Sequence, residues 1–290
     1  MTRLLFKHSR LPSAIMAAWV LALMTLLSAC GGGTSTTGVA PTDPTPPVTP
    51  PAPVLIAPGA YVASLNEKDW VAMLLPTTQG TSIVTNFYGL YYNAADPDLY
   101  SGTGLFTNIN SANFTRMSVY PNISAALRTG SGSLTNLGNG VVRAQLSFPA
   151  TSTEQSKDIT VAASAPGNYT YNTPASLNTV KGAWQGRWSY GFGYVDNFSL
   201  NVSALGDVTS SQTFQQDCFL TRGALAPSAD GTNLFTFTLT VPNATQCSLK
   251  SQTLTGAAFV SASPMAGKTQ RLYIVGVTTD GRGISYRADR

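Results

Sequence analysis

The sequence predicts an all-β protein with two antiparallel halves, barrel-like or sandwich-like, that follow a disordered stalk. From Gly59 to Arg290, short runs alternate apolar and polar side chains and are rich in Val, Thr, Tyr and Phe. Gly, Asn, Asp and Pro separate these runs, which is typical of strands joined by turns. No stretch of this region has a clear 3.6-residue apolar period, so we expect no long helix.

The N-terminal residues are typical of an export signal. Three basic residues precede an uncharged apolar run over residues 14–27. This run is shorter than the roughly 20 residues that a membrane-spanning helix needs, but it suits a secretory signal peptide. It ends in Leu27-Ser28-Ala29-Cys30 and is followed by Gly31. We therefore expect residues 1–29 to be removed on export.

The segment Leu27-Ser28-Ala29-Cys30 resembles the lipobox of bacterial lipoproteins. The resemblance implies a diacylglyceryl group on the Cys30 thiol, cleavage just before this residue and acylation of the new amine. Two acyl chains suffice for stable anchoring, at about 0.8 kcal/mol per buried methylene. In that family an Asp after the Cys favours the inner membrane, so Gly31 implies a lipid anchor in the outer membrane. A plain signal peptide with a coincidental cysteine is the alternative.

The mature composition excludes several classes of function. The chain has 17 basic and 13 acidic residues, and three basic residues lie in the signal peptide, which leaves 14 against 13. These charges are scattered singly, so we expect no nucleic-acid partner. The single histidine, His8, is also removed, which excludes Ser-His-Asp and Cys-His catalysis and His-liganded zinc. No nucleophile-elbow or phosphate-loop motif is present, and we expect neither an enzyme nor a cofactor nor a metal site.

Composition divides the mature chain into three parts. Residues 30–58 are rich in Gly, Thr, Ser and Pro, which favours an extended tether. A segment with turn residues and a proline, 169–178, suggests a boundary between an N-terminal β domain, 59–173, and a C-terminal β domain, 174–290. A single helical turn is expected over residues 175–180.

The expected strands suit up-and-down antiparallel barrels. In the C-terminal domain eight strands are expected, at 183–190, 195–203, 208–214, 218–226, 232–241, 252–262, 269–277 and 281–287. In the N-terminal domain nine are expected, near 60–64, 69–75, 82–92, 99–107, 113–120, 122–129, 131–136, 141–148 and 158–163. The segment Gly130-Ser131-Gly132 suggests a distorted strand or a bulge.

The start of the C-terminal domain, Gly182-x-Trp184 after a short helical turn, resembles the first strand of lipocalins. In that family the Trp plugs one end of the barrel and an Arg near the last strand packs over it, a place that Arg282 or Arg287 can take here. An ordinary inward-facing aromatic residue is the alternative. Gly59-Ala60-Tyr61 is a fainter echo of the same pattern.

Two further groups have alternative interpretations. In the run from Phe87 to Tyr92, residues 87, 89 and 91 should face one side of a strand and residues 88, 90 and 92 the other. One side is core, and the other is either a binding surface or an ordinary cross-strand pair. The close carboxylates Asp96 and Asp98 suit a turn better than a catalytic pair or a calcium site.

The two-domain arrangement is similar in outline to the two-barrel surface lipoproteins, which include the factor H-binding and transferrin-binding lipoproteins. The likeness is one of architecture, and no binding residue is transferred. We expect a membrane-anchored envelope lipoprotein that is non-catalytic and either binds a protein partner or has a structural role. The alternative is a carrier that holds a small apolar ligand inside a lipocalin-like barrel.

Export delivers the remaining cysteines, Cys218 and Cys247, to an oxidising compartment, where we expect them to form a disulfide. Closing this loop of about 30 residues should stabilise the fold by roughly 3–4 kcal/mol. The intact mass of the exported protein should be lower by two hydrogen atoms before reduction than after it. Alkylation of both thiols in the native, unreduced protein would contradict the pairing, and the Cys218→Ser, Cys247→Ser double variant is the control.

Overall fold

The part of the chain that can be described lies between Ile56 and the C-terminus. The computed structural model describes residues 56–65, 68–79, 82–92, 98–108, 111–121, 127–152, 155–167, 169–190, 193–210, 222–242 and 249–290. The described residues contain no helix with the length and apolar character that crossing a membrane requires. Residues from Pro51 to Arg290 make up one compact unit.

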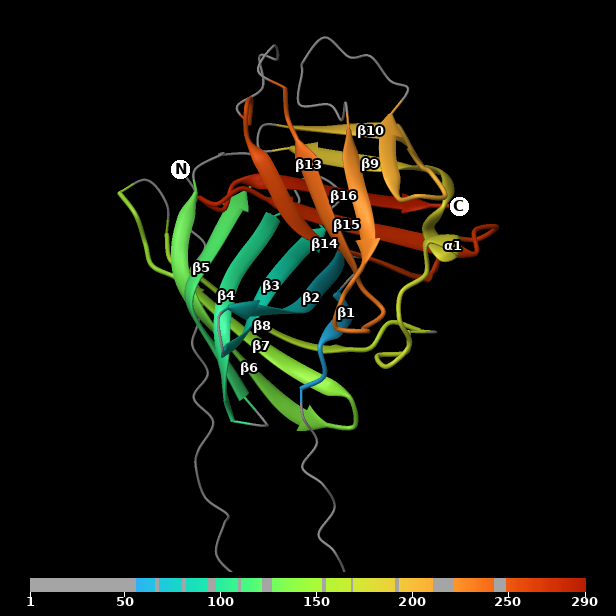
Figure 1. Cartoon of the computed structure of the whole chain (residues 1–290). Coiled ribbons are helices and arrows are strands. Elements are labelled where there is room, and N and C mark those ends of the chain that lie inside the picture. Colours follow the sequence, from blue (N-terminus) through green and yellow to red (C-terminus); the bar gives the residue numbers. More distant parts are fainter. Residues whose placement is uncertain are drawn as a thin grey trace, which may run out of the picture. The chain divides into compact units, whose positions relative to one another are not determined.

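Sixteen antiparallel strands form two eight-stranded barrels (Figure 1). The first barrel contains β1 (Gly59–Leu65), β2 (Lys68–Gln79), β3 (Ser82–Tyr92), β4 (Asp98–Asn108), β5 (Ser111–Pro121), β6 (Arg128–Gly138), β7 (Val141–Phe148) and β8 (Lys157–Ser164). The second contains β9 (Gly182–Tyr190), β10 (Gly193–Val202), β11 (Asp207–Ser210), β12 (Gly223–Pro227), β13 (Phe235–Thr240), β14 (Thr253–Ala262), β15 (Gln270–Val277) and β16 (Gly283–Asp289). The short helix α1 (Leu177–Val180) precedes β9.

Each strand pairs with its neighbours in the chain, and the first and last strands of each barrel meet. The second barrel closes along six register pairs between β16 and β9, from Ile284–Tyr190 to Asp289–Gln185. The first barrel is nearly closed, because β1 and β8 share the single register pair Val62–Ser164. The all-β prediction of two antiparallel barrels is confirmed, and neither half is a sandwich.

The strand β6 contains the whole expected strand at 131–136 and the last two residues of the strand expected at 122–129, of which residues 122–126 lie outside the described residues. Gly130 does not break this strand but lets it approach its neighbour, because a Cβ at Gly130 would lie 2.1 Å from the backbone oxygen of Ser147 on β7. The irregularity expected at Gly130-Ser131-Gly132 is present, because the register of β5 against β6 shifts between the pair Phe114–Gly132 and the pair Met117–Gly130.

The two barrels begin with the same local structure, so the faint sequence echo is real. Gly59 and Gly182 both have positive φ angles, +143° and +109°, that favour glycine. Two residues later an aromatic side chain enters the barrel and donates a hydrogen bond to the carbonyl four residues before it. Tyr61 Oη donates to Ala57 O at 2.7 Å, and Trp184 Nε1 donates to Val180 O at 2.6 Å.

The segment before β1 is part of the first barrel. Ile56 is only 3% exposed and packs in the core with Tyr61. The folded region therefore includes residues 56–58, which the composition assigned to the tether. Tyr171, from the connection between the barrels, covers Tyr61 at a ring distance of 5.4 Å.

The arginine that covers Trp184 is Arg290, and the expectation of Arg282 or Arg287 is wrong. The Arg290 guanidinium lies 4.1 Å from the centre of the Trp184 ring. Alternation along β16 explains the choice, since Tyr286 and Ala288 face the core and Arg287 faces outward. Arg282 lies in the turn before β16 and pairs with Asp280.

Arg290 also holds α1 against the end of the second barrel. Its Nη2 donates to Thr179 O at 2.8 Å and its Nε donates to Gln270 Oε1 at 2.8 Å. The helix begins at Ser176, whose hydroxyl accepts a hydrogen bond from Asn178 N, as N-cap residues do. The expected helical turn over 175–180 is thus present as α1, and Val180 is buried in the barrel core.

The two barrels share an apolar contact that we call the inter-barrel face. It consists of outward-facing side chains of β1–β3 and of β14 and β15, together with Leu234 and Tyr169; the strand residues are Ala60, Val71, Met73, Leu75, Tyr88, Leu90, Ala257, Phe259, Tyr273, Val275 and Val277. Residues of alternate parity on the same strands, such as Leu74 and Ile274, fill the barrel interiors. These strands are therefore buried on both sides.

The alternation predicted for the run from Phe87 to Tyr92 is confirmed at three described positions. Phe87 lies in the interior of the first barrel, whereas Tyr88 and Leu90 lie in the inter-barrel face. The surface that Tyr88 contributes to is thus an internal one.

Phe259 is the test residue for the inter-barrel face. It is fully buried and its ring lies 5.0 Å from that of Tyr273 and 6.0 Å from that of Tyr169. Phe259→Ala should lower the free energy of unfolding by about 3–5 kcal/mol, because it leaves a cavity between the barrels. Urea denaturation measures this loss. Leu205→Ala is the control, since Leu205 is 85% exposed, and its change should stay within about 0.5 kcal/mol.

Candidate functional site

The interior of the first barrel holds no space for a ligand at its described centre. A void of about 10 Å³ lies among Tyr61, Trp70, Leu74 and Leu134, with alanine and valine side chains around it. That volume is about the least that a single water molecule requires. A small apolar ligand of the kind expected for a carrier does not fit there.

Large side chains also fill the second barrel. Trp188 packs on Phe198 with ring centres 5.3 Å apart, and Phe198 lies 6.1 Å from Tyr286. Tyr286 Oη donates to the backbone oxygens of Phe198 at 3.0 Å and Trp184 at 3.1 Å. Burial raises the pKa of Tyr286, so the phenol stays protonated and serves as a structural donor.

A hollow on the described surface lies on the outside of the first barrel, and we call it the outer trough. It crosses β5, β6, β7 and β8 and has a volume of about 560 Å³. Its floor follows one cross-strand row in which Phe114 pairs with Gly132, Gly132 with Leu146, and Leu146 with Ile159. Since Leu146 faces the core, the residues on either side of it face outward into the trough.

Polar side chains form both walls of the outer trough. One wall is the row of Asn113, Ser133, Gln145 and Thr160, which are paired in that order across the four strands. The other wall contains Ser131, Ser147 and Asp158, again in register. The trough therefore has polar side chains along both walls, although apolar atoms make up most of its accessible lining.

Asp158 supplies the only charge among the lining side chains. Its Oδ1 accepts a hydrogen bond from Ser147 Oγ at 2.6 Å, and both side chains are exposed. No lysine or arginine lines the trough. The arrangement offers hydroxyl, amide and carboxylate groups for hydrogen bonding.

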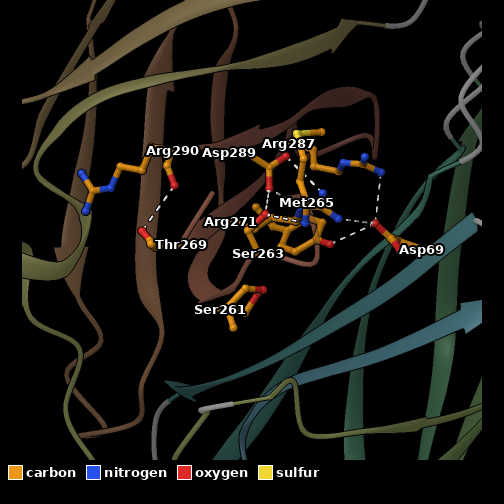
Figure 2. Close-up of polar contacts among 11 residues, drawn as sticks. Asp69, Ser261, Ser263, Met265, Thr269, Arg271, Arg287, Asp289 and Arg290 are labelled. Atoms are coloured by element: carbon orange, nitrogen blue, oxygen red, sulfur yellow. Dashed lines mark hydrogen bonds and ion pairs between the residues drawn. The ribbon is translucent and has the colours of Figure 1, made fainter. Parts of the chain in front are cut away.

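A second polar group joins the two barrels at the margin of the inter-barrel face (Figure 2). Asp69 on β2 of the first barrel accepts three hydrogen bonds from the second barrel through Oδ2. The donors are Arg271 Nη1 at 3.1 Å, Tyr273 Oη at 3.1 Å and Arg287 Nη1 at 3.0 Å. The Asp69 side chain is 15% exposed, so these bonds are largely sheltered from water.

Asp289 on β16 completes this network. Arg271 binds it in a bidentate manner, with Nε 2.7 Å from Oδ1 and Nη2 3.1 Å from Oδ2. Ser263 Oγ also donates to Asp289 Oδ1 at 2.6 Å. Burial alone would lower the pKa of Arg271, but its hydrogen bonds to Asp289 and Tyr273 raise that pKa above its ordinary value. Two carboxylates thus balance two guanidinium groups, and the network is structural.

No metal site emerges from the described part of the chain, in which no three His, Cys, Asp or Glu side chains gather. Cys30, Cys218 and Cys247 lie outside the described residues, and so does Asp96, while Asp98 is described only by its backbone at the start of β4. The lipid on Cys30 and the disulfide therefore stay predictions.

Cys218 and Cys247 both lie in segments outside the described residues, each between two described strands. Cys218 lies in the chain between β11 and β12, and Cys247 lies between β13 and β14. Gly223, at the start of β12, pairs with Leu239, next to the last residue of β13. Both connections therefore leave the barrel from the same end and from adjacent strands.

The sequence reasoning identified neither the outer trough nor the Asp69 network. A signal for the network existed, because Asp69 directly precedes an unbroken apolar run, Trp70–Leu75, that alternation does not explain. A similar run, Leu272–Val277, follows Arg271. The trough had no such signal, since its residues look like those of any exposed strand face.

Comparisons with known proteins do not place the chain in a family. No family model matches it, and no match was found among curated proteins or solved structures.

Removal of the Asp69 charge should weaken the joint between the barrels. Asp69→Asn removes the anionic acceptor that Arg271, Tyr273 and Arg287 share in a sheltered place, and we expect a loss of about 1–3 kcal/mol in the free energy of unfolding, measured in urea. Asp196→Asn is the matched control, because Asp196 pairs with Arg187 at 2.5 Å but is 52% exposed. That variant should lose less than about 1 kcal/mol. Equal losses in the two variants would contradict the role assigned to Asp69.

Proposed function

We propose that this chain is a lipid-anchored protein of the bacterial cell envelope that is not an enzyme. The lipid on Cys30 would hold it at the outer membrane, and it would act by binding a partner or by structural contact through the outer surface of its barrels. The lipobox-like segment Leu27–Cys30 supports the anchor. The observation that carries the assignment to the outer surface is the close packing of the described side chains inside both barrels.

The same observation weakens the alternative of an apolar ligand carrier. Such a carrier needs a cavity of several hundred Å³ that is lined mainly by apolar groups. The void in the first barrel is about 10 Å³, and aromatic rings occupy the second barrel. No described feature favours the carrier over the outer-surface function.

The described titratable groups also support a non-catalytic function. Burial raises the pKa of Tyr61 to about 12 and raises that of Tyr273 as well, so both phenols are neutral near pH 7. Asp69 and Asp289 are held by arginines, and the mature chain has no histidine. A general base needs a pKa near the working pH and access to a substrate, and these groups lack that access.

The anchor is tested by changing the acylated residue. In cells fed labelled palmitate, Cys30→Ala should abolish the label on the protein and move it from the membrane fraction to the soluble fraction, because the thiol that accepts the diacylglyceryl group is missing. Cys218→Ser is the matched control, since it also removes one thiol but should keep the label. Continued labelling of Cys30→Ala would refute the lipid anchor.

A further inference from the structure

We propose that the outer trough binds a neutral glycan, about three sugar units in length. This inference rests on one part of the proposed function, the assignment of recognition to the outer surface, and it does not depend on the lipid anchor. It is argued from the register, the hydrogen-bonding capacity, the charge and the size of the trough.

The register sets a regular array of polar groups. Asn113, Ser133, Gln145 and Thr160 stand on four consecutive strands in one cross-strand row. Neighbouring strands lie about 4.8 Å apart, so successive side chains of this wall are separated by a distance comparable to the length of one sugar ring. The row runs across the strands, and a ligand lying in the trough would meet one polar group of this wall at each strand.

Most of these polar groups have unused hydrogen-bonding capacity. Among the described residues, the side chains of Ser131, Ser133, Gln145 and Thr160 form no hydrogen bond with one another or with other groups. Each hydroxyl and each amide can both donate and accept. A complementary ligand must therefore also offer many donors and acceptors in a small length, as the hydroxyl groups of a sugar do.

Charge and polarity narrow the ligand class further. The single lining charge is the Asp158 carboxylate, which would repel an anionic ligand such as a phosphate or a sialylated glycan. An apolar ligand would remove water from the hydroxyl and amide groups of both walls without replacing their hydrogen bonds, which is unfavourable. A neutral, hydrogen-bonding ligand avoids both the charge repulsion and the loss of hydrogen bonds. The Asp158 carboxylate can also accept hydrogen bonds from the hydroxyl groups of such a ligand.

An extended peptide suits the trough less well. Peptides that bind β-proteins usually add a strand to a free sheet edge and use main-chain hydrogen bonds. The floor residues Gly132 and Leu146 lie inside the sheet, and each is paired with residues on both neighbouring strands. The trough thus offers side-chain groups and no free main-chain edge.

The size of the trough sets the length of the ligand. Four strands span three inter-strand spacings, about 14 Å, which corresponds to roughly three sugar rings in a row. The volume of about 560 Å³ falls in the range of small-molecule sites, roughly 300–1,000 Å³. Because the trough is open at the surface, the bound unit can also be a segment of a longer polysaccharide.

Calorimetric titration of the mature full-length chain tests the site. The protein is purified in a detergent without a sugar headgroup, so that the detergent does not compete. N,N′,N″-Triacetylchitotriose represents the N-acetylglucosamine of envelope glycan strands, maltotriose represents a plain glucan, and 3′-sialyllactose is the anionic trisaccharide. We expect at least one neutral trisaccharide to bind at least tenfold more tightly than 3′-sialyllactose, and the better of the two neutral ones indicates the source.

Two trough variants and one control connect the binding to the site. Gln145→Ala and Thr160→Val each remove hydrogen-bonding groups from the same wall and should weaken the binding of the better neutral trisaccharide by about tenfold. Thr240→Val makes the same change as Thr160→Val at an exposed position on β13 of the second barrel, and its affinity should be unchanged. Circular dichroism of each variant verifies that the β fold is retained.

Several results would overturn the glycan site. The first two are the absence of binding by both neutral trisaccharides and equal binding of 3′-sialyllactose. The third is unchanged affinity in both trough variants. The fourth is binding only of a synthetic peptide with the sequence of residues 34–48, which belong to the tether. If the trisaccharides fail to bind while palmitate labelling of Cys30 persists, the glycan inference fails and the anchored envelope protein stands. If they bind but the label is absent, the anchor fails and the glycan site stands.

Discussion

The arrangement of this protein depends on the burial of β2 and β15 on both of their faces. A barrel strand normally shows one face to the core and the other to water, but here Val71 and Met73 from one barrel share a buried apolar cluster with Tyr273 and Val275 from the other. Polar groups at the margin of such an apolar contact are shielded from water, so they need hydrogen-bond partners within the protein. Asp69 takes that place, and its carboxylate accepts bonds from three side chains of the second barrel. The two barrels are consequently a single packed unit.

Much of the fold could be predicted from the sequence, because strand alternation and turn residues are local signals. Residues 142–148 alternate strictly between apolar and polar, and β7 buries every second one of them. The choice of the arginine over Trp184 needed more than local information. Arg287 and Arg290 are an odd number of residues apart, so alternation places their side chains on opposite sides. Only the register of β16 against β9 decides which of them faces the end of the barrel. Sequence patterns locate strand ends to within a few residues at best. An error of one residue in the register moves every side chain to the opposite face of the strand.

The candidate site was beyond sequence reasoning for a related reason. Ser133 and Gln145 are twelve residues apart, and Thr160 lies fifteen residues further along the chain. They come together because three hairpins fix the register of four strands, and that register includes a shift near Phe114. Neutral polar residues on exposed strand positions carry no pattern of their own. Their significance appears only when the rows are aligned.

The unequal closure of the two barrels has a mechanical consequence. Any tension carried along the chain from its N-terminal side would reach the folded unit at Ile56 and pass directly into β1. That strand joins β2 along seven register pairs but meets β8 at only one, Val62–Ser164. Under load the first barrel should therefore part along this seam, while the second, sealed by six pairs between β9 and β16, keeps its shape. A molecule under tension would thus unfold in steps. The barrel nearest the point of attachment would open first, because its closure is the weaker of the two.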